Sequence, residues 1–206
     1  MPFAYARHLM ELIVIRHGRP ERVENVEGGA NPGLNDKGRG QADAMASWLA
    51  DEHIDALYVS PMLRARQTAA PLEQALDLEA TVEAWIQEYD AADPHYIPLE
   101  ELKADKEAWR AYVAAEDALE RTKFAIEVMS AVDDIVDRHR SQRVALVCHG
   151  GVINIIAARV LGLADRMFFN PYYTSINRFM FAASGERSVS TLNDTGHLRG
   201  QAHLQD

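Results

Sequence analysis

Two histidines in this chain stand directly after apolar runs and directly before a glycine. His17 follows ELIVIR, whose last residue is Arg16, and His149 follows RVALVC. A further arginine, Arg64, lies within the segment SPMLRARQTA. One isolated histidine of this kind is more often a structural residue bonded to backbone, because short motifs carry a high false-positive risk. The repeated pattern, with arginines nearby, favours a functional site.

These residue types suit the transfer of a phosphoryl group. Guanidinium groups bind phosphate oxygens through paired hydrogen bonds and stay charged at any working pH. A neutral imidazole can attack phosphorus to give a phosphohistidine, which divides one difficult step into two easier ones. The leaving oxygen then needs a proton, which a carboxylic acid of raised pKa can supply.

Apolar runs alternate with helical patterns and predict the elements that position these residues. Strands are expected at ELIVIRHG, ending at Gly18, and at 56–60, 81–86 and 143–151. Two further segments, 175–184 and 188–195, are expected to form a terminal hairpin. One helix is expected after a cap at Asn35 or Asp36, and a second from Ser60 with a kink or restart at Pro71. Much of 98–140 is expected to be helical with breaks around 115–122, and a last helix runs from Gly151 to near Gly162.

Strands that alternate with helices predict an α/β protein: a three-layer sandwich with a mainly parallel sheet and antiparallel C-terminal strands. Ligands of such sheets bind beyond the carboxyl ends of the strands. Four polar clusters follow the ends of separate expected strands: Arg16-His17-Gly18, Ser60 with Arg64, Glu88, and His149-Gly150-Gly151. These clusters are therefore expected at one edge of the sheet.

The motifs resemble those of the histidine phosphatase superfamily, in its phosphoglycerate-mutase-like branch. The resemblance is carried by Arg16-His17-Gly18, Leu34 to Ala42, Ser60 to Ala69, Val147 to Gly151, and Leu192 to Leu198. These segments occur in the family's order from residue 11 to residue 198. The resemblance implies a single phosphoglycerate-mutase-like domain over 1–206, with a helical cap insert at about 89–123.

The resemblance also implies roles for individual residues. His17 would be the nucleophile, and Arg16, Arg64 and His149 would hold the transferred phosphoryl group. Glu88 stands where the family has its acid/base glutamate. These roles are coherent physically, because cations around the equatorial oxygens are most of what phosphoryl transfer requires of a protein.

Two glycines complete the expected phosphate-binding set. Gly18 lets the chain turn close to the site, and Gly150 opens a helix whose free N–H groups favour an anion. No metal or other cofactor is expected, because the arginines neutralise the charge and no carboxylate–histidine spacing makes a persuasive metal site.

The assignment of the acid has two competitors, Glu83 and Asp90. Glu83 falls within the expected third strand, where it fits a solvent-facing position. Glu88 is preferred because it follows that strand and matches the family's position for the acid.

The sequence departs from the family's pattern after the first motif. Arg19-Pro20 stands where the family often has Glu-Thr, and the asparagine that follows is displaced to Asn25. The loop is therefore not expected to bind what the glycolytic mutases bind. The cap insert at 89–123 holds nine acidic and five basic side chains, whereas a mutase needs extra cations for a doubly phosphorylated intermediate.

A phosphatase that acts on a small monophosphate with a neutral, cationic or partly apolar body is therefore predicted. A phosphoglycerate-mutase-type isomerase is the alternative. A non-catalytic phospholigand-binding protein is a third hypothesis, which the presence of His17, His149, Arg16 and Arg64 disfavours.

The composition sets outer limits on partners and location. The 206 residues are 48% hydrophobic and 25% charged, as in soluble globular proteins, and the formal net charge of −10 disfavours nucleic acid and anionic membranes as partners. Cys148 is the one cysteine, so no internal disulfide is expected. Arg7, His8 and Glu11 interrupt the apolar start, so a cytoplasmic protein is expected. The substrate, the oligomeric state and the choice of Met1 or Met10 as start remain open at this level.

Overall fold

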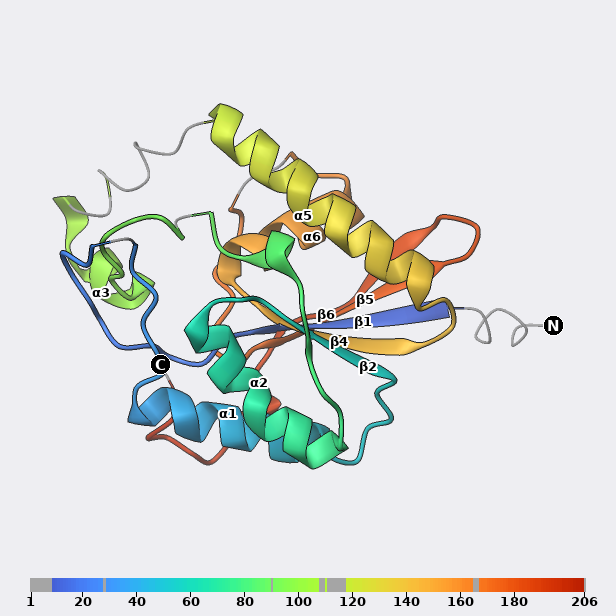
Figure 1. The fold of residues 1–206 in the computed structure, drawn as a ribbon, viewed down its shortest axis with the longest axis horizontal. Coiled ribbons are helices and arrows are strands. Elements are labelled where there is room, and N and C mark those ends of the chain that lie inside the picture. The colour runs from blue at the N-terminus through green and yellow to red at the C-terminus, as the bar shows by residue number, and fades with distance from the viewer. Residues whose placement is uncertain are drawn as a thin grey trace.

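The computed structural model describes residues 9–27, 29–89, 91–107, 110, 118–164 and 167–205. The chain forms the following helices and strands in order (Figure 1): β1 Leu9–Arg16, α1 Asp36–Leu49, β2 Ala56–Val59, α2 Leu63–Leu76, β3 Thr81–Val82, the 3₁₀ turn η2 Ala84–Ile86, α3 Leu99–Ala104, α5 Ala118–Arg138, β4 Arg143–Cys148, α6 Gly150–Leu161, β5 Ile176–Ala182, β6 Arg187–Asp194 and the 3₁₀ turn η3 Gly196–Leu198. Within this part of the chain, no helix combines the length and apolar character that a bilayer crossing requires.

One six-stranded sheet, in the order β3-β2-β4-β1-β5-β6, organises the molecule. The strands β1 to β4 pair in parallel, and β5 and β6 add an antiparallel hairpin beside β1. The register places Arg16 of β1 opposite Cys148 of β4, and Val59 of β2 opposite Val147. Three of the predicted polar clusters therefore lie side by side, just beyond the carboxyl ends of adjacent strands. The predicted α/β fold is confirmed.

Helices cover both faces of the sheet, α1 and α2 on one side and α5 and α6 on the other (Figure 1). Successive side chains of a strand point to opposite faces, and β1 follows this rule. Leu12 and Val14 pack in the cluster on the α5–α6 side, whereas Ile13 and Ile15 pack in the cluster on the α1–α2 side. The near-continuous apolar runs of the central strands are explained by burial on both faces.

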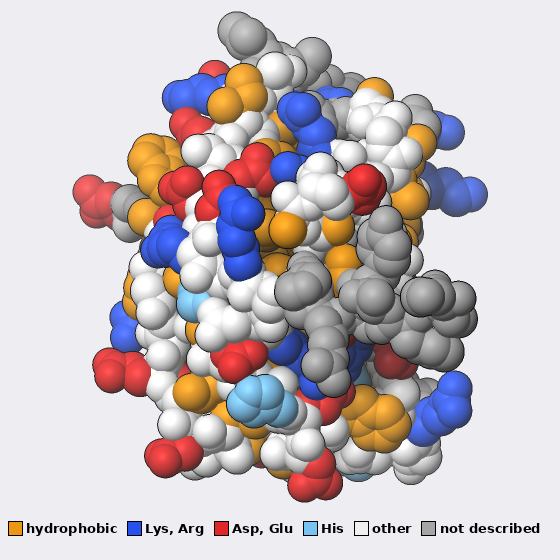
Figure 2. Space-filling view, turned by 90° about the vertical axis from the view of Figure 1, so that its right-hand side faces the viewer, with side chains coloured by type: hydrophobic (Ala, Val, Ile, Leu, Met, Phe, Trp, Pro, Cys, Tyr) orange, Lys and Arg blue, Asp and Glu red, His pale blue; other side chains and the backbone are white. Residues whose placement is uncertain are grey.

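Ion pairs join three strands at the end of the sheet where β1 begins. Glu11 of β1 accepts from Nε of Arg143 in β4 at 2.6 Å and from Nη1 of Arg178 in β5 at 2.9 Å. Burial raises the pKa of Glu11, but the hydrogen bonds from Arg178 and Arg143 outweigh it and leave that pKa lowered. Figure 2 views this end, where acidic and basic side chains are interspersed. The polar clusters described above lie at the opposite end.

The third strand is shorter than the sequence predicts. β3 spans Thr81–Val82, and the chain then turns into η2 instead of continuing to residue 86. Glu83 causes the turn, because its carboxylate accepts from the N–H of Trp85 at 3.2 Å and caps the 3₁₀ helix. Both residues of β3 are exposed, so no packing holds a longer edge strand in place.

Helix α2 begins later than predicted, and of the two outcomes predicted at Pro71, a kink or a restart, the restart does not occur. It begins at Leu63 after Met62, because the hydroxyl of Ser60 is bonded to His149 and accepts only a 3.3 Å contact from the N–H of Met62. It also continues through Pro71 to Leu76 without a restart. The lost hydrogen bond at the proline is tolerated where neighbouring residues such as Leu72 pack in the core.

The predicted cap insert, 89–123, is described only in part. Residues 90, 108–109 and 111–117 lie outside the described residues. Of the break expected around 115–122, residues 118–122 are helical instead, because α5 begins at Ala118. The described part begins with a turn at 91–92 and then pairs with the loop after β1: Val23 and Tyr96 exchange backbone hydrogen bonds of 3.1 and 2.8 Å. Helix α3 follows this pairing. The segment therefore lies over the loop that leaves the site.

Candidate active site

A small cavity of about 70 Å³ lies beyond the carboxyl ends of the parallel strands. Its wall is made by Arg16, His17, Arg64, Glu88, Tyr89, Tyr96, Ile97, Leu102, Gly150, Met167 and Asn170. Five of the sequence-predicted site residues are in this set. A sixth, His149, is adjacent, because its ring centroid is 5.1 Å from that of His17.

The hydrogen bonds of His17 fix which ring nitrogen carries its proton. Nδ1 lies 2.8 Å from the carbonyl oxygen of Gly18. A carbonyl only accepts, so Nδ1 is the protonated nitrogen and Nε2 carries the lone pair. Nε of Arg64 donates to this Nε2 at 3.3 Å.

The surroundings of His17 keep its ring neutral. The side chain is buried, with 2% of its surface exposed. Burial lowers the pKa of His17 well below its ordinary value of 6.5, and the charges of Arg64 and Arg16 lower it further. A neutral, oriented imidazole with its lone pair at Nε2 has the properties of a nucleophile.

His149 is held by the serine that begins the second motif. Nε2 of His149 lies 2.7 Å from the hydroxyl of Ser60, and both residues are fully buried. Burial lowers the pKa of His149 well below 6.5, with further lowering from Arg64, His17 and Arg16. Among the residues that the structure describes, Nδ1 of His149 has no hydrogen-bond partner.

Aromatic rings hold both arginines. The guanidinium of Arg16 lies 4.1 Å from the ring centroid of Tyr173, and Nη1 donates to the carbonyl of Pro171 at 2.5 Å. The guanidinium of Arg64 lies 4.7 Å from the ring centroid of Tyr96. Cation–π contacts of this kind fix the plane of the guanidinium without using its N–H groups.

Arg64 gives the strongest indication that this cavity binds an anion. Only 1% of the surface of Arg64 is exposed. Within the described chain, its Nη1 has no hydrogen-bond partner. A buried cation is costly unless it is paired. The uncompensated charge beside His17 therefore makes this cavity a site for a small anion.

Glu88 reaches the cavity wall from the segment after η2. Its Oε2 accepts from the N–H of Gly151 at 2.9 Å, and its Oε1 accepts from the N–H of Tyr89 at 3.2 Å. The carboxylate is thereby fixed at the start of α6. Glu83 is occupied as the cap of η2, and Asp90 lies outside the described residues.

The two predicted glycines have different places. Gly150 lies on the cavity wall, whereas the backbone groups of Gly18 bond to protein partners: its N–H donates to Oγ1 of Thr68 at 2.9 Å. A side chain at Gly18 would put Cβ 2.6 Å from the carbonyl oxygen of Gly38. Gly18 therefore allows the close approach of α1 to the site instead of lining the cavity.

Sequence reasoning missed Tyr173 and Thr68. Tyr173 stacks on Arg16, and Thr68 anchors the backbone after His17. Thr68 lies within the second motif, four residues after Arg64, so helical spacing places both on one face of α2. Tyr173 belongs to no motif, and only the folded chain brings it to the site.

An α/β sandwich with this buried set of two imidazoles, two guanidiniums and a carboxylate has the features of a phosphoryl-transfer enzyme. The comparison with known families agrees. The family model described as histidine phosphatase superfamily (branch 1) matches residues 12–195. The chain belongs to this superfamily, and the predictions of family and of phosphatase activity are confirmed.

Similar proteins cover nearly the full chain. Phosphoglycerate mutase-like protein 4 of Arabidopsis thaliana is 27% identical, with 95% of this chain and 90% of that protein covered. Phosphoserine phosphatase 1 of Hydrogenobacter thermophilus is 27% identical, with 92% and 95% covered. The solved phosphoserine phosphatase of Entamoeba histolytica has a TM-score of 0.73 at 23% identity, with 92% and 99% covered, and supports the fold.

Proposed function

We propose that the protein hydrolyses a phosphomonoester, without a metal, through a phosphohistidine on His17. The observation that carries this proposal is the pair of hydrogen bonds on the His17 ring. Nδ1–H is committed to the carbonyl of Gly18, so the lone pair of Nε2 faces Arg64 and the cavity. This geometry supports attack on a bound phosphoryl group.

In the first step Nε2 of His17 forms a bond to phosphorus, and the bond from phosphorus to the alcohol oxygen breaks. The departing oxygen takes a proton from Glu88. In the second step water attacks the phosphohistidine and gives its proton to Glu88, and the nitrogen–phosphorus bond breaks. Inorganic phosphate and the free alcohol are the products, and the enzyme returns to its initial state.

The positive groups around the cavity carry the electrostatic part of the proposal. Arg16 and Arg64 would bind the equatorial oxygens, and Nδ1 of His149 would donate to one of them. Gly150 at the start of α6 adds the positive end of a helix. Preorganised donors of this kind are usually the largest source of catalysis in such reactions.

We also propose that residues 1–206 form one domain in which part of 89–123 caps the site. Tyr96, Ile97 and Leu102 support this because they line the cavity. The cap and the loop after β1 are tied by Glu101, which pairs with Arg19 and with Arg22, each at 3.2 Å.

The same ion pairs favour a phosphatase over a mutase. A mutase must retain a second phosphate, which requires cations beyond those around the first. The additional cations of the loop, Arg19 and Arg22, are paired with the carboxylate of Glu101. Arg22 also pairs with Glu24, its Nε donating at 2.8 Å, so two carboxylates compensate the two positive charges within the protein.

The proposed substrate is a small phosphorylated metabolite. Two relatives at 27% identity are named phosphoserine phosphatases, one from Hydrogenobacter thermophilus and one from Arabidopsis thaliana. We place the protein in the cytoplasm on the basis of its composition, in which the one cysteine, Cys148, is buried and unpaired.

Release of phosphate from p-nitrophenyl phosphate tests the activity, with His17→Ala as the inactive comparison. A non-catalytic binding protein would show no release above that variant. Intact-mass measurement after a rapid alkaline quench tests the covalent step, and a single phosphate adduct that maps to His17 is expected. An adduct on another residue would contradict the mechanism. Conversion of one phosphoglycerate isomer to another without release of phosphate would assign the protein to the mutases.

A further inference from the structure

A larger groove of about 450 Å³ adjoins the phosphate cavity. The two spaces share three lining residues, Glu88, Tyr89 and Met167. The groove extends from there between η2, α5 and α6. Its volume falls within the range of about 300–1,000 Å³ of small-molecule sites, whereas the phosphate cavity is several times smaller than that range.

The floor and sides of the groove are largely apolar. Trp85 and Tyr89 expose 56% and 45% of their surface. The ring of Tyr89 meets that of Phe124 edge to face, with centroids 6.0 Å apart, and Ile155 and Met167 complete this wall. Aromatic surface left open beside a catalytic site is typical of a ligand-binding groove.

Charges on the rim of the groove have both signs. Glu120 and Glu127 are acidic, and Arg121 and Lys123 are basic. Because neither sign dominates, the rim offers no strong attraction to a ligand body of high net charge. The aromatic wall favours an uncharged body.

We propose that this groove binds the alcohol part of the substrate, and that the preferred substrate is a phosphomonoester of a bulky, uncharged aromatic or alkyl alcohol. The proposal rests on the proposed function, because it takes Glu88 as the proton donor to the leaving oxygen. A general acid must lie within hydrogen-bond reach of that oxygen. The alcohol therefore begins at Glu88, where the groove also begins, and the phosphate cavity has no room for it.

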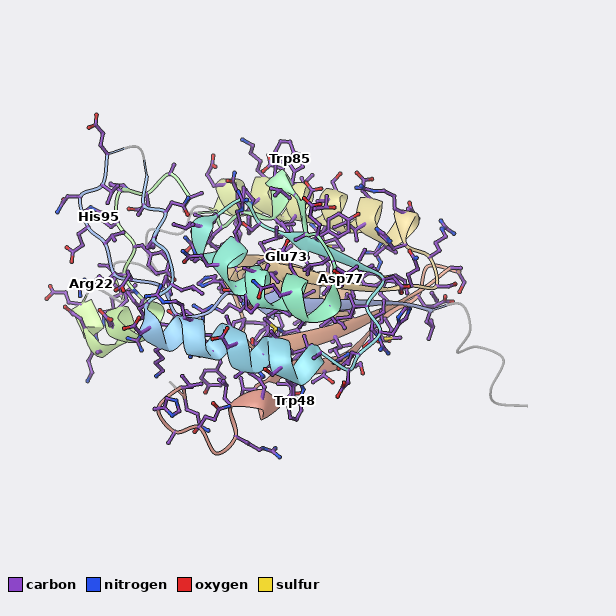
Figure 3. All side chains as sticks on the ribbon, turned by 60° about the horizontal axis from the view of Figure 1, so that its bottom comes forward. Arg22, Trp48, Glu73, Asp77, Trp85 and His95 are labelled. Carbon is purple, nitrogen blue, oxygen red and sulfur yellow. The ribbon has the colours of Figure 1, made fainter. Side chains whose placement is uncertain are left out.

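The chain contains a matched control for the key aromatic residue. Trp85 and Trp48 are both half-exposed, at 56% and 52%. Figure 3 shows them on opposite sides of the molecule, Trp85 near α5 and Trp48 near the C-terminal turn. Replacement of either exposed ring by alanine is not expected to prevent folding, so a difference between the two variants reports on the groove.

The test compares phenethyl phosphate with ethyl phosphate, which have the same type of leaving oxygen and differ in the aromatic body. In the wild type, kcat/KM for phenethyl phosphate is expected to exceed that for ethyl phosphate by about tenfold or more. Trp85→Ala should reduce this ratio by about fivefold, mainly by raising KM for phenethyl phosphate, with a smaller effect on kcat/KM for ethyl phosphate. Trp48→Ala should change neither value.

Two outcomes would overturn the groove assignment while the phosphatase proposal stands: equal efficiency for both esters, or a ratio that Trp85→Ala leaves unchanged. Sedimentation of the same variants tests whether a second copy of the chain occupies the groove instead. A wild-type dimer that Trp85→Ala dissociates, with no change in the ratio, would assign the groove to a second copy of the chain. Absence of phosphate release from every ester, p-nitrophenyl phosphate included, would overturn the proposed function and this inference together.

Discussion

Nε of Arg64 donates a hydrogen bond to Nε2 of His17 at 3.3 Å, so a guanidinium covers the lone pair expected to attack phosphorus. The same positive charge helps to lower the pKa of His17. Arg64 thus adds to the effect of burial in keeping the imidazole neutral, and it holds the ring in place in the free protein. A bound phosphoryl group offers Arg64 stronger, charged acceptors, which would release the lone pair when the substrate arrives.

Arg64→Lys should lower kcat/KM for p-nitrophenyl phosphate by about 10²-fold or more, because a point charge replaces a flat fork of donors. Steady-state kinetics measures this change. Arg66→Lys is the matched control, since Arg66 lies two residues on in α2 and is exposed. Equal losses in the two variants, or no loss at Arg64, would remove Arg64 from the site.

The pH dependence of kcat/KM should reflect the lowered pKa of His17. Because burial and the two arginines favour the neutral ring, His17 stays competent as the pH falls below 6.5, its ordinary pKa. The acidic limb of the profile should therefore lie below pH 6.5, and the alkaline limb should appear where the acid, Glu88, is lost. A rate that rises steadily to about pH 9 would contradict the assignment of Glu88.

Much of the fold follows from local patterns in the sequence. The apolar runs at β1 and β4 can be recognised because both faces of these strands are buried. Asn35 accepts from the N–H of Gly38 at 2.8 Å and caps α1 as predicted, and Gly162 ends α6 in the left-handed region at φ 69°. The site residues could be placed at one edge because each follows a parallel strand.

The remaining features depend on tertiary contacts that no local pattern encodes. β3 ends after two residues because the side chain of Glu83 caps a 3₁₀ turn. The hydrogen bond to this side chain competes with the backbone hydrogen bonds that would extend the strand. Helix α2 continues past Pro71 because packing against the sheet supports it. The rings of Tyr96 and Tyr173 reach the arginines from distant segments, so their roles appear only in the folded chain.

Gly151→Ala should displace the carboxyl group of Glu88, the proposed acid, without changing its chemistry. A Cβ at this position would lie 2.1 Å from Oε1 of Glu88, so the carboxylate must move away from the N–H that fixes it. The loss in kcat should be larger for ethyl phosphate than for p-nitrophenyl phosphate, whose leaving group needs little protonation.

Comparison with Glu88→Gln shows whether Gly151 acts through Glu88. If it does, the loss in kcat of the double variant should be little larger than that of Glu88→Gln alone, because both changes remove the same function, proton donation by Glu88. Fully additive losses, or an equal loss for both esters, would mean that the alanine disturbs the phosphate cavity instead.

His197 should make the stability of the fold depend on pH. Its Nε2 lies 2.9 Å from Oγ1 of Thr174, whose hydroxyl donates to the carbonyl of Tyr173 at 2.7 Å. Burial lowers the pKa of His197 to about 4, although the charge of Asp194 acts in the opposite direction. Between pH 6.5 and about 4 the unfolded chain therefore binds more protons at this residue than the native protein does.

The stability contributed by the neutral ring is thus complete above pH 6.5 and is lost as the pH falls towards 4. At about 1.4 kcal/mol per pH unit, the loss is about 3 kcal/mol. His197→Gln keeps an N–H donor for Thr174 but does not titrate, so its free energy of unfolding in urea should fall by about 3 kcal/mol less over this range. His203→Gln, at an exposed histidine, should retain the wild-type slope. Identical slopes for the wild type and His197→Gln would show that His197 is not the titrating group, since the buried rings of His17 and His149 remain in both proteins.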